Sequence, residues 1–449
     1  MRKALLFPLF VLACSAEATP KAPQAPRWLD APTTAVALRQ GIDVVLPLHL
    51  DRTAAKATVV APEGIGATVD SDGASLRLRA DYTVADDAAV TVTLKTDDGA
   101  PATTVEVRAH IVPLGWIDRQ TWSETDGPQA REHTSMFLDE DTRVVYMLQG
   151  TGYSPQWKPI DDNWQLDLAS KTWSRWNPTG DVPEPGATRR AVHVPGTKVY
   201  YLYGGSTGFQ ETEVGDPALY RVDLGNPAHT FTKLTQVGAP ERTRVLHAFG
   251  YDTEKKIFVV FGGVFQSATE QALLSDTWTF TLEGDTATWK EVKSAQKPSA
   301  RYGGFHATDS TSHRFFVWSG AQQPKGKDMI NAASDLWALD LSSAQPSWSV
   351  VETTGATPPG RRNGCWIHDP KTQRLFVFGG TPDGVVSTPG LFALDLRPGH
   401  EGWSTVAAAA PPPRSSGSGF FDPTTGRGYC GFGNDRELYR DMNVLGYPE

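Results

Sequence analysis

The feature that most constrains this chain is a spacing between arginine and glycine that recurs along its second part. Arg131 precedes Gly150 by 19 positions, and four further pairs keep that interval: Arg244 and Gly263, Arg301 and Gly320, Arg361 and Gly380, and Arg414 and Gly433. Eight positions after each of these arginines stands an aspartate: Asp139, Asp252, Asp309, Asp369 and Asp422. Arg189 and Gly205 form a shorter copy, 16 positions apart. Such a period indicates one supersecondary unit used six times.

Each copy predicts four β-strands. The aspartate side chain can accept a hydrogen bond from the backbone two residues on and so begin a turn. The returning segments, such as Ile257–Phe261 and Leu375–Phe378, are apolar without alternation, which is typical of strands buried on both faces. After the glycine and a variable loop, a third strand carries an aromatic residue in one register: Trp164, Tyr220, Trp278, Trp337, Phe392 and Tyr439. A fourth strand is marked by Trp173 or Trp176, Phe231, Trp289, Trp348 and Trp403.

These glycines, followed by an aromatic strand and then a tryptophan, resemble the kelch repeat over about residues 115–445. The resemblance implies a β-propeller, whose four-stranded blades pack radially. The sixth copy reaches Tyr439 without a fourth strand before Glu449. We therefore expect the segment ahead of Arg131, including Trp122, to supply it. The predicted fold is all-β, with a six-bladed kelch-type β-propeller at 115–449 closed by an N-terminal strand.

The first residues predict export. Arg2 and Lys3 precede the apolar run 4–12, the pattern of a signal peptide over residues 1–14. The sequence of residues 11–14, Val-Leu-Ala-Cys, resembles the bacterial lipobox, which implies that Cys14 is lipidated and tethers the protein to a membrane, periplasmic or at the cell surface. An ordinary secretory signal is the alternative. Residues 15–26 are rich in Pro and Ala and predict an extended linker.

Residues 27–113 predict a second all-β domain. Short runs with period two, such as Ser75–Arg79 and Ala89–Leu94, are separated by turn sequences at Asp72-Gly73 and Asp98-Gly99. About seven such runs fit an immunoglobulin-like β-sandwich. We expect it to act as a spacer between membrane and propeller, with a carbohydrate-binding sandwich as the alternative.

Composition excludes several classes of protein. The 42 Gly and 33 Pro among 449 residues are incompatible with a helical bundle. The net charge of -9 disfavours nucleic acid as a partner. Three cysteines are too few for a disulfide scaffold. Adjacent blades could join Cys365 and Cys430 in an oxidising compartment, and two buried free thiols are the alternative.

The repeat arginines predict a candidate binding face. In an up-and-down blade the start of strand one lies at the same edge as the loop between strands two and three, and such loops often carry function. Guanidinium groups recognise carboxylate and sulfate well, so we expect an anionic glycan or an acidic protein segment as the ligand. The alternative is a structural arginine that bonds to the neighbouring blade. The residues predicted for this face are Arg131, Arg189, Arg244, Arg301, Arg361, Arg414, Tyr153, Trp157, Phe209 and Phe265.

No catalytic, metal or cofactor site is predicted. His133, His247, His306 and His368 stand at different offsets from their repeat arginines, so they do not form a shared ligand ring. Loop carboxylates show no telling spacing. The chain is thus interpreted as an exported, membrane-tethered, monomeric binding protein. The alternative is a carbohydrate-active enzyme on the same propeller, similar to sialic acid epimerases or to galactose oxidase.

Overall fold

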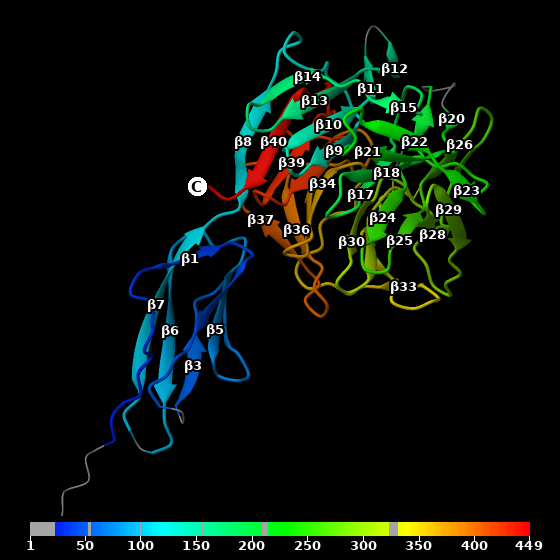
Figure 1. Ribbon diagram of the computed structural model, residues 1–449. Helices are drawn as coiled ribbons and strands as arrows, with labels where there is room; N and C mark the ends of the chain where they lie inside the picture. Colours follow the sequence, from blue (N-terminus) through cyan, green and yellow to red (C-terminus); the bar gives the residue numbers. More distant parts are fainter. Residues whose placement is uncertain (1–22, 53–54, 99, 154–155, 209–213, 323–330) are drawn as a thin grey trace, which may run out of the picture. The chain divides into compact units, whose positions relative to one another are not determined.

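The structure is a computed structural model that describes residues 23–52, 55–98, 100–153, 156–208, 214–322 and 331–449. Every regular element in these ranges is a β-strand (Figure 1). The chain divides into two compact units. The first holds the chain up to Leu38 with Asp43–Ala80 and Asp86–Ile111, and the second holds Arg39–Ile42, Asp81–Ala85 and Val112–Glu449. Within the described ranges, no helix has the length and apolar character needed to cross a membrane.

The first unit contains two antiparallel sheets. Their strand orders are β1-β7-β6-β3 and β2-β5-β4. Side chains of β5 and β6 alternate between buried and more exposed positions, as the period-two pattern predicts, and Leu76, Leu78, Val90 and Val92 are fully buried. The strands are β1 (Val36–Arg39), β2 (Asp43–Pro47), β3 (Lys56–Val60), β4 (Ile65–Val69), β5 (Ser75–Ala80), β6 (Ala88–Lys95) and β7 (Thr103–Val112).

The second unit contains, among the described residues, six sheets built on four antiparallel strands in up-and-down order. Sheet one is β9 (Ser135–Asp139), β10 (Val144–Leu148), β13 (Asn163–Asp167) and β14 (Thr172–Arg175). Sheet two is β17 (Arg190–His193), β18 (Val199–Tyr203), β21 (Leu219–Asp223) and β22 (Thr230–Lys233). Sheet three is β24 (Ala248–Asp252), β25 (Ile257–Phe261), β28 (Thr277–Glu283) and β29 (Thr286–Glu291).

The remaining three sheets follow the same order. Sheet four is β30 (Phe305–Asp309), β31 (Arg314–Trp318), β32 (Leu336–Asp340) and β33 (Ser347–Val350). Sheet five is β34 (Cys365–Asp369), β35 (Arg374–Phe378), β36 (Leu391–Asp395) and β37 (Gly402–Val406). Sheet six is β38 (Ser418–Asp422), β39 (Arg427–Gly431), β40 (Asp441–Gly446) and β8 (Gly115–Thr121).

Short strands extend or accompany these sheets. Two of them pair in parallel with the fourth strands of sheets two and three, and the others form small ribbons in the loops. They are β11 (Thr151–Tyr153), β12 (Trp157–Pro159), β15 (Thr179–Gly180), β16 (Gly186–Ala187), β19 (Ser206–Thr207), β20 (Val214–Gly215), β23 (Thr235–Val237), β26 (Val264–Gln266) and β27 (Gln271–Leu273).

The repeated glycine of one copy hydrogen-bonds to the repeated arginine of the next copy and so links neighbouring sheets. The backbone N–H of Gly380 in sheet five donates to the carbonyl oxygen of Arg414 in sheet six at 2.8 Å. Equivalent bonds run from Gly205 to Arg244, Gly263 to Arg301, Gly320 to Arg361 and Gly433 to Arg131. The last of these joins sheet six to sheet one.

The residue before this glycine must adopt a left-handed backbone close to the next sheet. Gly379 has a φ of 68°, and a Cβ there would lie 2.2 Å from the carbonyl oxygen of Arg414. Glycine avoids that clash. Ser319 and Gln149 stand at the corresponding positions of sheets four and one with φ values of 62° and 49°, and the Ser319 hydroxyl donates to the carbonyl oxygen of Arg361 at 2.8 Å.

The strand missing from the sixth copy comes from the segment ahead of the first. β8 pairs antiparallel with β40, so that Asp441 faces Thr121. Trp122 follows β8 directly and donates its indole N–H to the carbonyl oxygen of Lys171 at 3.1 Å. Its ring packs edge-on against Trp173, 5.3 Å between centroids. Trp122 therefore packs against sheet one while its strand completes sheet six.

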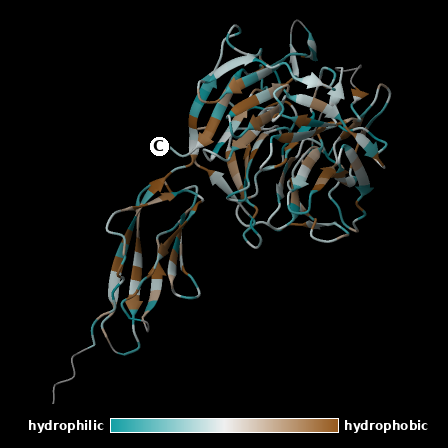
Figure 2. Ribbon diagram, viewed as in Figure 1, coloured by the Kyte–Doolittle hydropathy of each residue, from teal (hydrophilic) through white to brown (hydrophobic). Residues whose placement is uncertain are grey.

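The first strands of the sheets lie against one another around a common centre: β9 contacts β17, β17 contacts β24, β24 contacts β30, β34 contacts β38, and β38 contacts β9. Between adjacent sheets lie clusters of buried apolar side chains. Figure 2 shows the matching hydrophobic stretches on these strands.

Two further sequence predictions concern links between elements. The Asp369 carboxylate accepts the backbone N–H groups of Lys371 and Thr372 at 2.9 and 3.3 Å, which is the predicted turn. Cys365 on β34 and Cys430 on β39 form a disulfide between sheets five and six, with Cα atoms 6.1 Å apart. Of the two alternatives left open for these cysteines, the structure has the disulfide rather than free thiols.

Candidate functional site

The repeat arginines lie inside the sheets and not in solvent. Their exposed fractions range from 0% for Arg131, Arg244 and Arg414 to 4% for Arg189. Arg414 shows the common arrangement: Nη1 and Nη2 donate to the two carboxylate oxygens of Asp441 at 2.5 and 3.1 Å. Arg244 with Asp276 and Arg301 with Asp335 are forked in the same way. Arg131 and Arg189 each reach their aspartates, Asp162 and Asp216, through one Nη atom.

Burial and pairing act in opposite directions on these aspartates. Desolvation alone would raise the pKa of Asp441, but the hydrogen bonds and the charge of Arg414 outweigh it and hold the pKa below its usual value. The pKa of Asp276 and that of Asp335 are lowered in the same way by Arg244 and Arg301. These pairs are ionised at neutral pH, and their guanidinium groups are neutralised inside the chain.

Arg361 is the exception. Its Nε donates to the carbonyl oxygen of Pro359 at 3.0 Å and its Nη1 to that of Gly379 at 3.2 Å, and it pairs with no carboxylate of the described residues. Gly390 occupies the position before the aromatic strand that Asp335 holds in sheet four. The sequence treats the six repeat arginines as equivalent. In the structure five of them pair with an aspartate, and Arg361 does not.

The predicted aromatic residues lie at the edges of the loops. Tyr153 is 60% exposed and packs edge-on against Trp157, 6.2 Å between ring centroids. The two rings line a groove of about 590 Å³ with Gln129, Arg440 and others. Phe265 lies instead under the guanidinium of Arg242, 5.1 Å from ring centroid to Cζ. Phe209 and Cys14 lie outside the described residues.

The second unit has a central cavity of about 1000 Å³. The first strands of all six sheets and the turns that follow them line it. It therefore reaches the end of the sheets opposite to the repeat arginines. Trp366 on β34 also lines a second cavity of about 20 Å³, which contains Arg190 and the starts of the first strands. The centre of the second unit is thus wide at the turns and narrow beside the repeat arginines.

Arg190 is an unpaired cation at this narrowing. Its Cζ lies 4.8 Å from the centroid of the Trp366 ring, a cation–π distance. Its Nε donates to the carbonyl oxygen of His247 at 3.2 Å. Neither Nη group has a hydrogen-bond partner among the described residues. Desolvation lowers the pKa of Arg190 to about 10, so it stays charged at neutral pH.

Neutral histidines surround this guanidinium. The His306 ring lies 4.9 Å from the Trp366 ring, and desolvation followed by the charge of Arg190 lowers the pKa of His306 to about 3. Desolvation lowers the pKa of His368 to about 4. Nδ1 of His306 and Nε2 of His368 are buried without a protein partner among the described residues. We call Arg190, Trp366, His306 and His368 the channel site; it offers one cation, one aromatic face and two free imidazole nitrogens.

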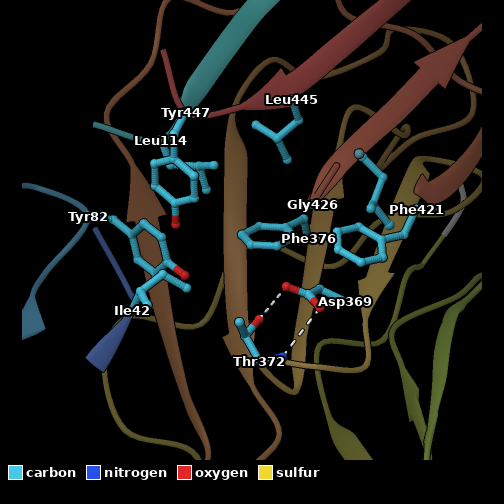
Figure 3. Close-up of a pocket in the computed structure, with 12 residues that line it drawn as sticks. Ile42, Tyr82, Leu114, Asp369, Thr372, Phe376, Phe421, Gly426, Leu445 and Tyr447 are labelled. Carbon is cyan, nitrogen blue, oxygen red and sulfur yellow. Dashed lines mark hydrogen bonds between the residues drawn. The ribbon is translucent and has the colours of Figure 1, made fainter. Parts of the chain in front are cut away.

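A separate small cavity in the second unit is too small for a ligand. It measures about 30 Å³ and is lined by Tyr82, Phe376 and Tyr447, among others (Figure 3). That volume holds about one water molecule. Asp369 at its edge is already bonded to Thr372, whose hydroxyl donates at 2.6 Å (Figure 3).

Sequence reasoning missed the channel site. Neither Arg190 nor Trp366 is among the residues that the sequence predicts for the binding face. One signal was present: side chains on the first strand of a blade alternate, so Trp366 and His368 face the same side of β34. For His306 and His368 the prediction of structural histidines over metal ligands stays a prediction. Among the described residues, no cluster of three potential metal ligands is found.

Comparisons with known proteins agree with the repeat. The KLHDC2/KLHL20/DRC7 Kelch-repeats domain model matches residues 198–421. Adagio-like protein 1 of Oryza sativa subsp. japonica is 26% identical over 281 residues, which are 60% of this chain and 42% of that protein. The chain therefore spans about two fifths of that relative.

Two further proteins are similar to this chain. N-(sulfonatooxy)prop-2-enimidothioate sulfolyase of Thlaspi arvense is 26% identical over 281 residues, 56% of this chain and 78% of that protein. The solved structure titled "Structure of YjhT" is 11% identical with a TM-score of 0.47, covering 77% of this chain and 98% of that one. The family match runs from β18 of sheet two to β38 of sheet six, and together with the repeated four-stranded sheets it shows that these residues form kelch repeats.

Proposed function

We propose that this protein binds an anionic ligand, and that the channel site holds the ligand's negative group. The observation that carries the proposal is Arg190, whose two Nη groups have no partner among the described residues although the side chain is held against Trp366. Arg190 is half-buried, and partial burial of a charge without a counter-ion is costly. A carboxylate or sulfate entering the central cavity would supply that counter-ion and accept forked hydrogen bonds.

The shape of the cavity favours a narrow ligand. The cavity, of about 1000 Å³, becomes narrower toward Trp366. Its walls include aromatic rings and the hydroxyls of Thr308 and Ser310. A chain of acidic sugar units could enter from the turns, stack on Trp366 and place its anionic group at Arg190. An anionic glycan is therefore the preferred ligand, and an acidic protein segment is the alternative that the binding test distinguishes.

The fold proposed for this function is a six-bladed propeller preceded by an immunoglobulin-like sandwich. The six sheets, the pairing of β8 with β40 and the hydrogen bond from Gly433 to Arg131 support the propeller. Two sheets of four and three strands support the sandwich. The sandwich is proposed as a spacer, and the protein as a monomer.

We also propose that the protein is exported and lipid-anchored. The disulfide between Cys365 and Cys430 supports an oxidising compartment, since structural disulfides are rare in the cytosol. Changing Cys14 to Ser should move the protein from the membrane fraction to the soluble fraction of its source bacterium. A variant that stays in the membrane fraction would remove the anchor from the proposal.

The binding test uses the full chain and three probes: oligogalacturonate, which carries carboxylates, dextran sulfate, and neutral dextran. We expect the wild-type protein to bind one of the charged probes and not the neutral one. Arg190→Met should weaken that binding about tenfold or more, because a hydrogen bond to a charged group contributes about 1.5–3 kcal/mol. Trp366→Leu should weaken it about five- to tenfold through loss of stacking.

The matched control is Arg436→Met, which removes an exposed arginine from the loop between β39 and β40, outside the channel site. It should leave the affinity within about twofold. Equal losses in Arg190→Met and Arg436→Met would mean that binding follows net charge alone, and the channel site would be refuted. Binding of an acidic peptide but of no charged glycan would select the alternative ligand. Chemical change of the bound glycan would make the carbohydrate-active enzyme the better reading.

A further inference from the structure

The geometry points to a second anion site, at Arg361 in sheet five, where a ligand's carboxylate takes the place of an aspartate that this sheet lacks. The site is separate from the channel site and does not rest on the proposed function. The same position recurs in six copies of one unit. The other sheets therefore show which group would pair with Arg361.

The other copies define the shape of the partner. In sheet three, Nη1 and Nη2 of Arg244 donate to the two oxygens of Asp276 at 3.1 and 2.9 Å. In sheet four, Arg301 meets Asp335 in the same forked way at 2.5 and 3.1 Å. A planar group with two oxygens therefore fits the outer edge of this guanidinium, and a carboxylate is such a group.

Sheet five keeps the arginine and its carbonyl contact but not the carboxylate. The bond from Arg361 Nη1 to the carbonyl oxygen of Gly379 at 3.2 Å matches the bond from Arg414 Nη1 to that of Phe432 at 3.1 Å. The Arg361 guanidinium is therefore held in the common orientation. Its Cζ also lies 4.9 Å from the centroid of the Phe392 ring, as Arg414 lies 4.6 Å from that of Tyr439.

Gly390 holds the position of the missing aspartate, and the Phe392 ring lies beside it, 3.0 Å from where a Cβ would stand. Glycine carries no side chain that could reach the guanidinium. Asp383, a carboxylate of the same loop, is engaged in its own turn: it accepts the Thr381 hydroxyl at 2.9 Å and the backbone N–H of Val385 at 2.8 Å. Arg361 as a whole is 2% exposed. Its Nη2 atom nevertheless keeps some surface accessible to solvent. Nη2 is therefore the atom that an entering carboxylate would reach.

The chain itself does not neutralise this charge within the described residues. Burial lowers the pKa of Arg361 to about 10, with no opposing carboxylate, so the group is still protonated at pH 7. A buried guanidinium held in the orientation of a bidentate pair, without the acid, is preorganised for a carboxylate from outside.

The test measures thermal unfolding of the full chain at pH 7 in sodium acetate against sodium chloride of equal ionic strength. Acetamide is the neutral control. We expect a saturable rise in the unfolding midpoint of about 2 °C in acetate, since a ligand that binds only the folded state stabilises it. Acetamide should give no rise.

Four variants test whether the rise belongs to this site. Arg361→Met should lose it, and Arg361→Lys, which keeps the charge but not the fork, should keep less than half. Asp335→Gly leaves Arg301 in the condition of Arg361 and should roughly double the rise. Arg190→Met, which tests the channel site, should leave it unchanged. No rise in the wild-type protein, or an undiminished rise in Arg361→Met, would overturn the proposal, and a rise lost only in Arg190→Met would assign acetate to the channel instead.

Discussion

Sheets five and six are neighbours with the same strand order, yet they treat the same buried arginine differently. In sheet six, Arg414 and Asp441 are 0% and 2% exposed at the side chain and form a forked ion pair. In sheet five, Arg361 has carbonyl partners only. The comparison separates two roles that the repeat spacing combines: the arginine backbone joins one sheet to the next, and its side chain requires a counter-ion.

The backbone role is present in both sheets. Gly320 donates to the carbonyl oxygen of Arg361 at 3.1 Å, and Gly380 donates to that of Arg414 at 2.8 Å. The side-chain role differs because Gly390 replaces an aspartate. Sheet five keeps the buried arginine but lacks the aspartate that would neutralise it. Such a position is suited to bind an anionic ligand, because the fold of the sheet does not depend on an internal counter-ion.

The largest effect is expected for Asp441→Asn. This change leaves the guanidinium groups of Arg414 and Arg119 without their shared carboxylate. Breaking a buried pair typically costs about 3–5 kcal/mol, and urea unfolding should show a loss of that size in the unfolding free energy. Glu437→Gln, an exposed change in the preceding loop, is the control and should cost less than about 0.5 kcal/mol.

Acid should erase the difference between wild type and Asp441→Asn. The pKa of Asp441 is lower in the folded protein than in the unfolded chain. Its contribution is therefore complete above the unfolded value and is lost as the pH falls through the lower folded value. The two unfolding free energies should converge below about pH 3.8. A difference that stays constant down to pH 2 would mean that the amide costs stability by some means other than charge.

The second effect concerns the disulfide that links these two sheets. Replacing both Cys365 and Cys430 by Ala should lower the unfolding free energy by about 2–4 kcal/mol, because the closed loop no longer restricts the unfolded chain. Reductant should destabilise the wild-type protein by a similar amount and leave the double variant unchanged. A wild-type protein with two titratable thiols before reduction would show that the disulfide does not form.

Much of this comparison could be predicted from the sequence. The spacing of Arg361 to Gly380 and of Arg414 to Gly433 required equal strand lengths and equal turns, and the structure has both. The need for a strand from outside the sixth copy followed from counting strands, and β8 supplies it. Spacing is local information, and it predicts local elements well.

The side-chain environment could not be predicted in the same way. Whether Arg414 faces solvent or Asp441 depends on the aspartate that precedes the third strand, and the loop between them varies in length from copy to copy. Arg190 and Trp366 come from different sheets, 176 positions apart, so no periodicity brings them together. The channel site depends on how the sheets surround a centre, and one sequence does not contain that geometry.

A smaller effect is expected for Asp335→Asn, which removes the charge of the carboxylate that pairs with Arg301 in sheet four. The Asp335 side chain is 39% exposed, so water screens the loss and the cost should be about 1 kcal/mol. Denaturant unfolding of this variant and of Asp441→Asn would show how strongly burial affects the contribution of an arginine–aspartate pair to the unfolding free energy. Equal costs for the two variants would contradict that account.

The smallest effect is expected for Arg361→Met in the absence of added carboxylate. The substitution loses hydrogen bonds to two carbonyl groups, and it also removes a buried charge that has no counter-ion. These contributions oppose each other, so the unfolding free energy should stay within about 0.5 kcal/mol of wild type. Arg414→Met should instead cost about 3–5 kcal/mol, because it leaves Asp441 buried beside a single remaining arginine. A loss above about 2 kcal/mol in Arg361→Met would mean that the chain does neutralise this arginine, and that sheets five and six differ less than their hydrogen bonds indicate.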